Sequence, residues 1–425
     1  MTDAALSPTS GHPPVPASDG HWLSVERLRA YSIIFLIVYL MISVFWVVKS
    51  DGMVDPRGEP LSYDFLAFYT ASDLVLAGDI RGLYDFETFA KRQHEIIPHQ
   101  KSLLLWNYPP SYALIVSPLA LLPYIPAFFL WTLSGFAAFL VVIYRILPAR
   151  TALLVAAAYP ATFWNLTHGQ NGFLVAALMG AGFLCLEKRP KLAGVFIGLM
   201  TFKPQVGVLI PVGLLCSRRW ATIAAAGATA VALAGAATLV TGFEGWRLAQ
   251  MAMGRIMAFA EQGYLAPERL TSLFASARAL GVGLESAYAV QIAGGLAVAA
   301  VIAKVWLGRA PFAAKAAVLV AGGPLATPYG FDYDLQVLAI AMAFLVKDAL
   351  ARGWLAYERE VLVLAWLAPL VATSLAVGIG FQAGFTGCLA LFVIAARRAF
   401  STALERETAA RRTSPSIAPS GASAG

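Results

Sequence analysis

Residues 31–48 read YSIIFLIVYLMISVFWVV, a run of eighteen residues without a charged side chain. An α-helix rises 1.5 Å per residue, so this run is about 27 Å long, close to the thickness of a bilayer's hydrocarbon core. The run begins far from the N-terminus and lacks a small-residue cleavage site. We therefore expect it to persist as a first membrane span and not to be removed as a signal peptide.

Similar apolar runs recur along the whole chain. Of the 425 residues, 59% are hydrophobic and 13% are charged, which leaves too little polar surface for a soluble domain of this length. We predict an all-α integral membrane protein with about twelve transmembrane helices. The expected spans lie near 31–48, 125–147, 151–165, 170–186, 192–203, 205–217, 220–241, 286–307, 313–327, 331–347, 359–377 and 380–396. Several are short, which a membrane protein tolerates where neighbouring helices shield a span or a water-filled cavity borders it.

Three parts of the chain depart from this pattern. Residues 109–123 (PPSYALIVSPLALLP) are interrupted by prolines, so we expect a re-entrant or interfacial segment there and not a full crossing. Residues 1–28 and 401–425 are rich in small and polar residues and are predicted to be disordered tails on either side of one membrane domain, 29–400. Two long loops, 49–108 and 242–285, interrupt that domain, and amphipathic juxtamembrane helices are expected in the first.

The distribution of charge predicts the orientation of these spans. With 109–123 not crossing, one side of the membrane holds 20 of the 31 basic residues and 9 of the 24 acidic ones, a net charge of +11, and the other side has a net charge of −4. The positive-inside rule makes the first side cytoplasmic, with both termini on it and both long loops outside. We therefore expect a multi-pass protein of the bacterial cytoplasmic membrane. The basic residues are scattered among short loops, so no stripe is left for nucleic acid.

Polar residues gather at turns that this topology places outside. They are His168 to Asn171, Lys203 to Gln205 and Thr327 to Asp334, together with the acidic first loop. Charged and amide side chains at this depth are costly unless they line a cavity or pair with each other. Four polar clusters at one level predict a single pocket, and no ligand spacing within them indicates a metal.

Asp64 is the acid of the first loop that opens a helical stretch, 63–78 (YDFLAFYTASDLVLAG). Phe68, Ala71 and Val75 share its helical face, which we expect to lie on the membrane and to bring the carboxylate to the hydrocarbon boundary. Desolvation there is expected to raise the pKa of Asp64 and to suit it to accept a proton. The alternative is an acid favoured only by the helix dipole.

Lys203 stands alone between two apolar runs, before a proline that breaks the helix. An ammonium in that place needs an anion, either a phosphate or the carboxylate of Asp332 or Asp334. His168 and Gln170 suit either sugar hydroxyls or the free backbone groups of a helix break. Arg269 and the other charged residues of the second loop are expected to form a solvated surface.

An ordered series of short motifs resembles glycosyltransferase family 87, the polyprenyl-phosphate-mannose-dependent mannosyltransferase-like enzymes of the GT-C fold. The series is Tyr63-Asp64-Phe65, Phe68-Tyr69-Thr70-Ala71, Ala77-Gly78, Leu83-Tyr84-Asp85, Tyr108-Pro109-Pro110, 117–123, Gly169-Gln170-Asn171, 194–198 and Lys203-Pro204. The resemblance covers roughly residues 30–400. It implies inverting transfer of a sugar from a polyprenyl-phosphate donor to a glycolipid or glycan acceptor outside the cytoplasmic membrane, without a cofactor.

The resemblance also implies roles for individual residues. Asp64 would be the general base, and Lys203 would hold the lipid phosphate beside Gln170, Asn171 and His168. Residues expected to line the pocket are Tyr63, Tyr69, Tyr108, Tyr329, Asp332 and Asp334. Mannosyltransferases of the family tend to carry adjacent histidines near the penultimate spans, whereas 327–334 (TPYGFDYD) has none, so the donor sugar is mannose or another hexose or pentose. The alternative function, a transporter or flippase of lipid-linked sugars, would favour a repeated pair of halves, and the sequence shows no convincing repeat.

Overall fold

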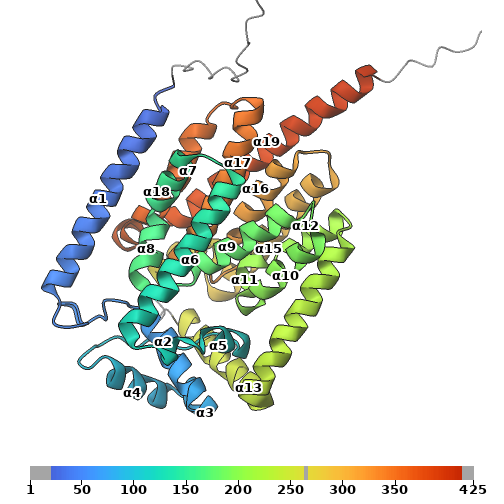
Figure 1. Cartoon of the computed structure of the whole chain (residues 1–425). Helices are drawn as coiled ribbons and strands as arrows, with labels where there is room; N and C mark the ends of the chain where they lie inside the picture. The colour runs from blue at the N-terminus through green and yellow to red at the C-terminus, as the bar shows by residue number, and fades with distance from the viewer. Residues whose placement is uncertain (1–20, 263–266, 414–425) are drawn as a thin grey trace, which may run out of the picture.

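The computed structural model describes residues 21–262 and 267–413, and all its named elements are helices. Six of them are long and apolar enough to cross a membrane (Figure 1): α1 (Val25–Lys49), α6 (Tyr124–Ile146), α13 (Trp220–Glu261), α15 (Leu284–Leu307), α18 (Glu358–Ile379) and α19 (Ala383–Thr413). Several shorter apolar helices accompany them. The chain is therefore a polytopic, all-helical membrane protein, and the number of crossings, about twelve, stays a prediction.

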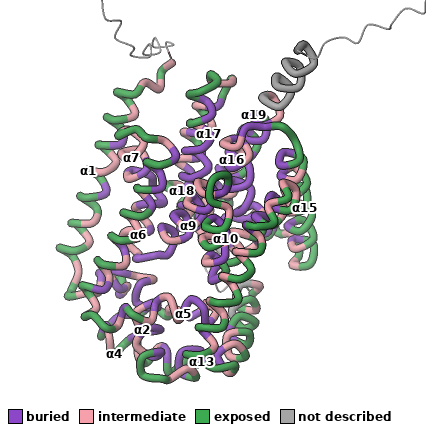
Figure 2. The backbone as a smooth tube through the Cα atoms, turned by 45° about the vertical axis from the view of Figure 1, so that its right-hand side comes forward, coloured by how far each residue is buried: buried purple, intermediate pink, exposed green. Residues whose placement is uncertain are grey.

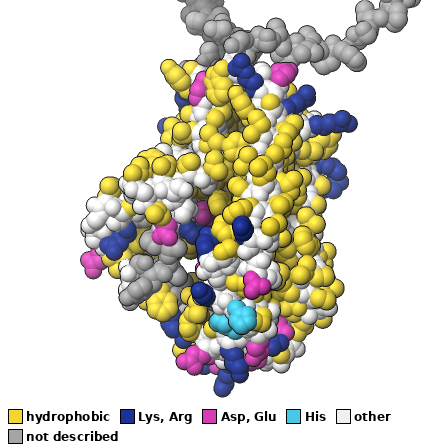
Figure 3. All heavy atoms as spheres, turned by 90° about the vertical axis from the view of Figure 1, so that its left-hand side faces the viewer, with side chains coloured by type: hydrophobic (Ala, Val, Ile, Leu, Met, Phe, Trp, Pro, Cys, Tyr) yellow, Lys and Arg dark blue, Asp and Glu magenta, His cyan; other side chains and the backbone are white. Residues whose placement is uncertain are grey.

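Both described ends of the chain lie at the same end of the bundle in Figure 1. Most of the two predicted tails falls outside the described residues, but α1 already begins at Val25 and α19 continues to Thr413, inside the ranges expected to be tails. Figure 3 shows hydrophobic side chains over the middle of one face. Basic side chains gather at the end near the termini, while acidic and basic ones mix at the other end.

The first long loop folds into a layer of helices at the end of the bundle far from the termini (Figure 1). It contains α2 (Phe65–Leu76), α3 (Ile80–Tyr84) and α4 (Phe86–Ile96), and is followed by α5 (Pro110–Val116) and η1 (Leu119–Leu121). Asp79 and Asp85 begin α3 and α4 by accepting hydrogen bonds from the backbone of Gly82 and Thr88 at 2.8 and 3.0 Å. The proline-rich segment thus forms two short helical pieces packed on α2.

One expectation about α2 is wrong. Its face with Phe68, Ala71 and Val75 does not lie on the membrane, because these three residues are buried within the protein. Phe68 packs edge-on against the ring of Tyr112, which α5 contributes. The sequence could not show this, since it depends on how the proline-rich segment folds back over α2.

The bundle interior consists of α9 (Gly172–Cys185), α16 (Phe312–Gly322) and α17 (Leu338–Arg352), and Figure 2 shows buried residues concentrated in α16 and α17. The partly exposed α10 (Pro190–Leu199) packs against α13. Glycines allow α10 to approach α13 closely: a Cβ added at Gly194 would lie 2.5 Å from the Thr222 carbonyl oxygen, and one at Gly198 would lie 2.5 Å from that of Ala226. Small residues at helix crossings are a common packing device in membranes. At Gly242, where φ is +66°, α13 breaks, and a second helical part continues into the predicted second loop.

Several predicted spans are interrupted helices. Proline starts a new segment at Pro160, Pro190, Pro204 and Pro324. The resulting pieces are α7 (Arg150–Ala157), α8 (Pro160–His168), η2 (Met200–Phe202), α11 (Pro204–Gly207), α12 (Ile210–Cys216), η4 (Pro324–Ala326) and η5 (Asp332–Val337). These breaks produce the turns in which the polar residues lie.

Candidate active site

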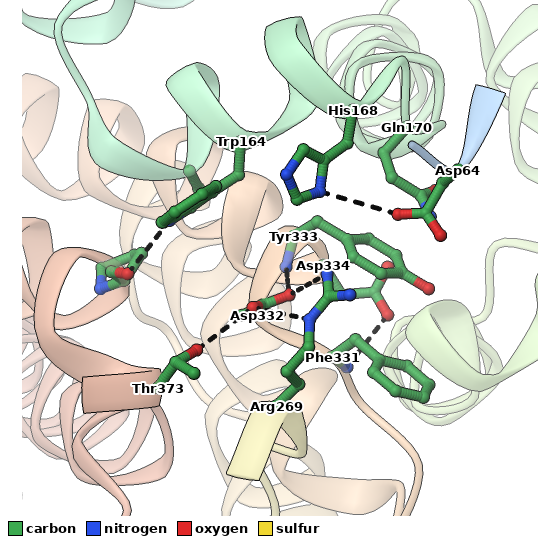
Figure 4. Close-up of polar contacts among 12 residues, drawn as sticks. Asp64, Trp164, His168, Gln170, Arg269, Phe331, Asp332, Tyr333, Asp334 and Thr373 are labelled. Atoms are coloured by element: carbon green, nitrogen blue, oxygen red, sulfur yellow. Dashed lines mark hydrogen bonds and ion pairs between the residues drawn. The ribbon is translucent and has the colours of Figure 1, made fainter. Parts of the chain in front are cut away.

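Four segments from distant parts of the sequence meet at one place in the bundle. They are Tyr63-Asp64 before α2, the turn between α8 and α9, the turn before α11, and η5 with the loop that precedes it. His168 lies against Asp64, Lys203 lies against Asp334, and Lys203 also bonds Asn171 of the turn between α8 and α9. Figure 4 shows Asp64, His168 and Gln170 beside the residues of η5. The expected gathering of polar turns is therefore present.

Asp64 lies just before the first residue of α2, opposite the end of α8. Its carboxylate oxygen Oδ2 lies 3.7 Å from Nδ1 of His168, and the two side chains are 19% and 21% exposed. Within the described part of the chain neither of these two atoms has a hydrogen-bond partner, although both are buried. An unpartnered buried carboxylate oxygen is costly, and such atoms are frequent where a ligand completes the site.

The pKa of Asp64 moves in the direction opposite to the expected one. Burial raises the pKa of this carboxyl, but the facing His168, the Arg269 guanidinium and Gln170 together hold it below its usual range. Burial could be expected from the sequence, but the neighbouring His168 and Arg269 side chains come from distant segments that only the fold brings to Asp64. Asp64 is consequently ionised at neutral pH and ready to accept a proton.

The end of α8 approaches the start of α2 as closely as the backbone permits. Gly169 caps α8 with φ +63°, and a Cβ there would lie 2.6 Å from Cβ of Phe65. Tyr63, next to Asp64, also has a positive φ of +35°, and its ring centroid lies 5.0 Å from that of His168. A non-glycine residue in this region is strained, and such strain is typical of functional sites. The backbone therefore fixes the distance between Asp64 and His168.

Lys203 has an internal partner in this structure. Its ammonium lies 2.5 Å from Oδ1 of Asp334 and donates to the side-chain oxygen of Asn171 at 2.9 Å, with the Tyr333 ring 4.6 Å away. Asn171 donates in turn to the hydroxyl of Tyr108 at 2.9 Å. Lys203 and Asp334 are 2% and 3% exposed. Of the two alternatives open for Lys203, the structure contains the pair with a carboxylate.

Arg269 was expected on a solvated surface, and that expectation is wrong. It is the last residue of the second loop's short helix η3 (Pro267–Arg269), and its Nε and Nη2 both bond the carboxylate of Asp332 at 3.1 Å. The guanidinium lies 5.8 Å from the ring centres of both Tyr63 and Tyr333. Figure 4 shows Arg269 reaching into the cluster from the side opposite His168.

A short strap connects Arg269 to the loop before η5. The backbone of Leu270 pairs with that of Phe331, the Thr271 amide donates to the Gly330 carbonyl at 2.8 Å, and the Ser272 hydroxyl donates to the Pro328 carbonyl at 2.7 Å. These bonds join two loops that are far apart in the sequence. They hold Arg269 at the site, although no sequence pattern indicates that position.

The other predicted pocket residues divide into two groups. Gln170 is buried beside Asp64, and Tyr63 and Tyr108 border the cluster. Tyr69 instead donates to the Leu122 carbonyl at 2.9 Å, under η1, and the hydroxyl of Tyr329 bonds that of Tyr288 on α15. The structure thus directs Tyr69 and Tyr329 away from Asp64.

The site thus has two parts. In one, the ionised carboxylate of Asp64 faces the imidazole of His168. In the other, Lys203 and Arg269 are paired with Asp334 and Asp332. Among the described residues, no group of three or more His, Cys, Asp or Glu side chains is suited to hold a metal ion. Such a site is equipped to accept a proton at Asp64 and to stabilise an anion near Arg269.

Comparison with known proteins bears on the chemistry. Glycosyltransferase family 87 matches residues 106–328, which is more than half of the chain. The chain belongs to glycosyltransferase family 87. No curated protein and no solved structure matches it. Membership makes this protein a membrane glycosyltransferase, and the resemblance drawn from the sequence motifs is confirmed.

The family match covers only part of the site. It includes Tyr108, the turn at 168–171, Lys203 and Arg269, and it ends before Asp332 and Asp334. Asp64 lies ahead of the matched residues. The role of this aspartate in the family 87 chain therefore rests on its geometry and on the motif around it.

Proposed function

We propose that this protein transfers a sugar, mannose or another hexose or pentose, from a polyprenyl-phosphate donor to an acceptor hydroxyl, with inversion at the anomeric carbon. The acceptor is a glycolipid or a glycan. Transfer takes place at the extracytoplasmic side of the bacterial cytoplasmic membrane, where the charge distribution orients the first loop. The observation that carries this proposal is the ionised, unpartnered Oδ2 of Asp64 facing His168 at 3.7 Å in a family 87 chain.

Asp64 acts as the general base. Its carboxylate takes the proton of the acceptor hydroxyl while the acceptor oxygen bonds to the anomeric carbon from the side opposite the phosphate. The bond between that carbon and the phosphate oxygen breaks, and polyprenyl phosphate leaves with the electron pair. His168 and Gln170 hold the carboxylate in its charged form and orient it.

Arg269 stabilises the leaving phosphate. A guanidinium binds phosphate and carboxylate in the same two-pronged geometry, so Asp332 occupies in this structure the place that a phosphate would take. Lys203 adds positive charge to the site without contacting the phosphate directly. It is only 2% exposed and is bonded to Asp334 and Asn171. Asn171, Tyr108 and Asp334 keep that lysine in position.

The proposal is tested with purified protein in proteoliposomes that contain labelled polyprenyl-phosphate sugars and an acceptor. Asp64→Asn removes the base without changing the size of the side chain, and transfer should fall by about 10²-fold or more. Asp73→Asn is the matched control, because Asp73 lies on α2, which Asp64 precedes, and its carboxylate pairs with Arg92 at a distance of 2.6 Å and not with a residue of the site. Near-normal transfer by Asp64→Asn, or relocation of the donor without a glycosylated product, would refute the proposal.

The role of Arg269 needs a paired experiment. Arg269→Gln leaves the buried Asp332 unpaired, so lost activity alone could reflect lost stability. The double variant Arg269→Gln/Asp332→Asn removes both charges and should recover thermal stability while transfer stays at least about 10²-fold low. Recovery of transfer together with stability would show that Arg269 serves only to neutralise Asp332.

A further inference from the structure

The opposite end of the bundle contains a groove that the transfer reaction does not use. A cavity of about 400 Å³ lies between the start of α16 and the last turn of α17, bordered by Phe312, Lys347 and Arg352. A second cavity of about 170 Å³ shares Phe312 and Glu187 with it and adds Arg219 and Lys315. α17 runs from η5 to this groove and is 15 residues long, so the groove is about 22 Å from the site along that helix.

The charges around this groove, which we call the basal groove, are mostly positive. Four basic residues and two acids, Glu187 and Asp348, line the two cavities. Asp348 is already matched, because Arg398 bonds it at 3.1 Å inside the protein and Arg352 at 3.0 Å. The groove therefore carries net positive charge toward whatever occupies it.

Two of the four basic side chains are available for a ligand. Lys315 is occupied, since its ammonium donates to the Trp306 and Gly308 carbonyls at the end of α15 at 3.1 and 2.8 Å. Lys347 and Arg219 border different cavities, and in the part of the chain that the structure describes their side chains have neither a hydrogen bond nor an ion pair. Each cavity therefore has one basic side chain that is left to bind an anion.

Large exposed apolar side chains are next in the sequence to residues that line the groove, Arg219, Trp306 and Ala351. Trp220, directly after Arg219, is 61% exposed, and Leu307 and Leu350 at the neighbouring helix ends are 69% and 62% exposed. An exposed tryptophan beside basic residues is typical of the level where lipid headgroups meet the hydrocarbon. A free phosphate ion would make no favourable contact with these apolar side chains, whereas the acyl chains of a lipid would cover them.

We propose that the basal groove binds the headgroup of an anionic phospholipid. Its phosphate would lie between Lys347 and Arg219, and its acyl chains would lie along Leu307, Leu350 and Trp220. Basic pockets at helix ends are known to hold acidic lipids in this manner. The bound lipid would fix the ends of α15, α16 and α17 relative to each other.

The test uses the purified full chain in detergent micelles, titrated with phosphatidylglycerol or phosphatidylcholine, with bound lipid counted by native mass spectrometry. Each basic residue near an anionic headgroup contributes about fivefold in affinity, so Lys347→Gln/Arg219→Gln should bind phosphatidylglycerol about 30-fold more weakly than the original chain. Arg145→Gln/Arg150→Gln is the matched control, because it removes two basic residues of the same end away from the groove and should bind normally. The single variant Lys347→Gln, with an expected loss of about fivefold, serves if the double variant is not recovered.

Three results would overturn the proposal. The groove variant could bind phosphatidylglycerol as tightly as the control, or phosphatidylcholine could bind the original chain equally well. Inorganic phosphate at millimolar concentration could also displace the lipid completely, which would make the groove a site for a soluble anion. None of these readouts depends on sugar transfer, so they stay separate from the test of the proposed function.

Discussion

Two cations balance two buried acids at the site. Asp332 and Asp334 are 5% and 3% exposed, and a carboxylate so buried needs a cation to stay charged. Lys203 is the cation paired with Asp334. The structure supplies the second cation, Arg269, from a position 63 residues before Asp332. Counting charges indicates that a partner is missing, but only the folded strap at 270–272 identifies which arginine it is.

The pH dependence of transfer tests the environment of Asp64. Its pKa lies below the ordinary value of 3.8, so the carboxyl is charged above that pH and loses its function as a base only as the pH falls through the lowered value. Between pH 5 and 8, kcat/KM should show no decline that is caused by Asp64. His168→Gln should shift the acidic decline to higher pH, because it removes one group that stabilises the carboxylate.

The measurement is transfer in proteoliposomes from about pH 3 to about pH 8 for the original chain, His168→Gln and Asp64→Glu, so that the start of a decline below 3.8 falls within the range. A decline centred between pH 5 and 7 that moves when Asp64 is replaced by glutamate would contradict the lowered pKa. A decline that stays in place in all three proteins would belong to another group.

Helices and their breaks were more predictable than the packing between them. The proline after Lys203 correctly indicated the break at Pro204, and the polar residues at the predicted turns do meet. The break at Pro160 was missed, because the predicted span 151–165 ran through it. The covering of α2 by α5 was missed, because an apolar face fits a membrane and a protein interior equally well. Period and composition identify an apolar face without identifying what covers it.

The pair of Lys203 and Asp334 joins the break between α10 and α11 to η5, so it should contribute to stability at the level of these elements. Lys203→Met leaves the carboxylate of Asp334 buried and unpaired, and should destabilise the protein by about 3–5 kcal/mol. The double variant Lys203→Met/Asp334→Leu removes both charges and should recover most of that loss. The measurement is the thermal unfolding temperature in detergent.

This experiment also decides between the two alternatives for Lys203. If Lys203→Met lowers donor affinity and leaves the unfolding temperature unchanged, the lysine serves the phosphate more than it serves Asp334. If the double variant regains stability but not transfer, the pair has both functions. Arg352→Met, at the far end of α17, provides a comparison in which Asp348 keeps its second partner, Arg398.

The whole molecule has an electrical asymmetry that follows from the sequence alone. The loops assigned to one side carry a net charge of +11 and those on the other side −4. In the structure, the C-terminal ends of α9, α12, α15 and α17 lie around the basal groove, on the side with the net charge of +11. The site with Asp64 lies near the opposite ends of these helices. Orientation in the membrane is thus predicted by charge and fold together.

Labelling of single cysteines from outside the cell tests this orientation. Cysteine is introduced at Gly283, which has open space around its backbone before α15, and at Arg309, between α15 and α16, in a chain whose Cys185, Cys216 and Cys388 are replaced by alanine. Because the second long loop should face outward, a membrane-impermeant maleimide should label position 283 in intact cells and position 309 only after the membrane is opened. Labelling of both positions in intact cells would indicate leaky cells, and the reverse pattern would place Asp64 on the cytoplasmic side. In that case the donor lipid would have to present its sugar to the cytoplasm, and the proposed site of transfer would be wrong even if the Asp64 chemistry were right.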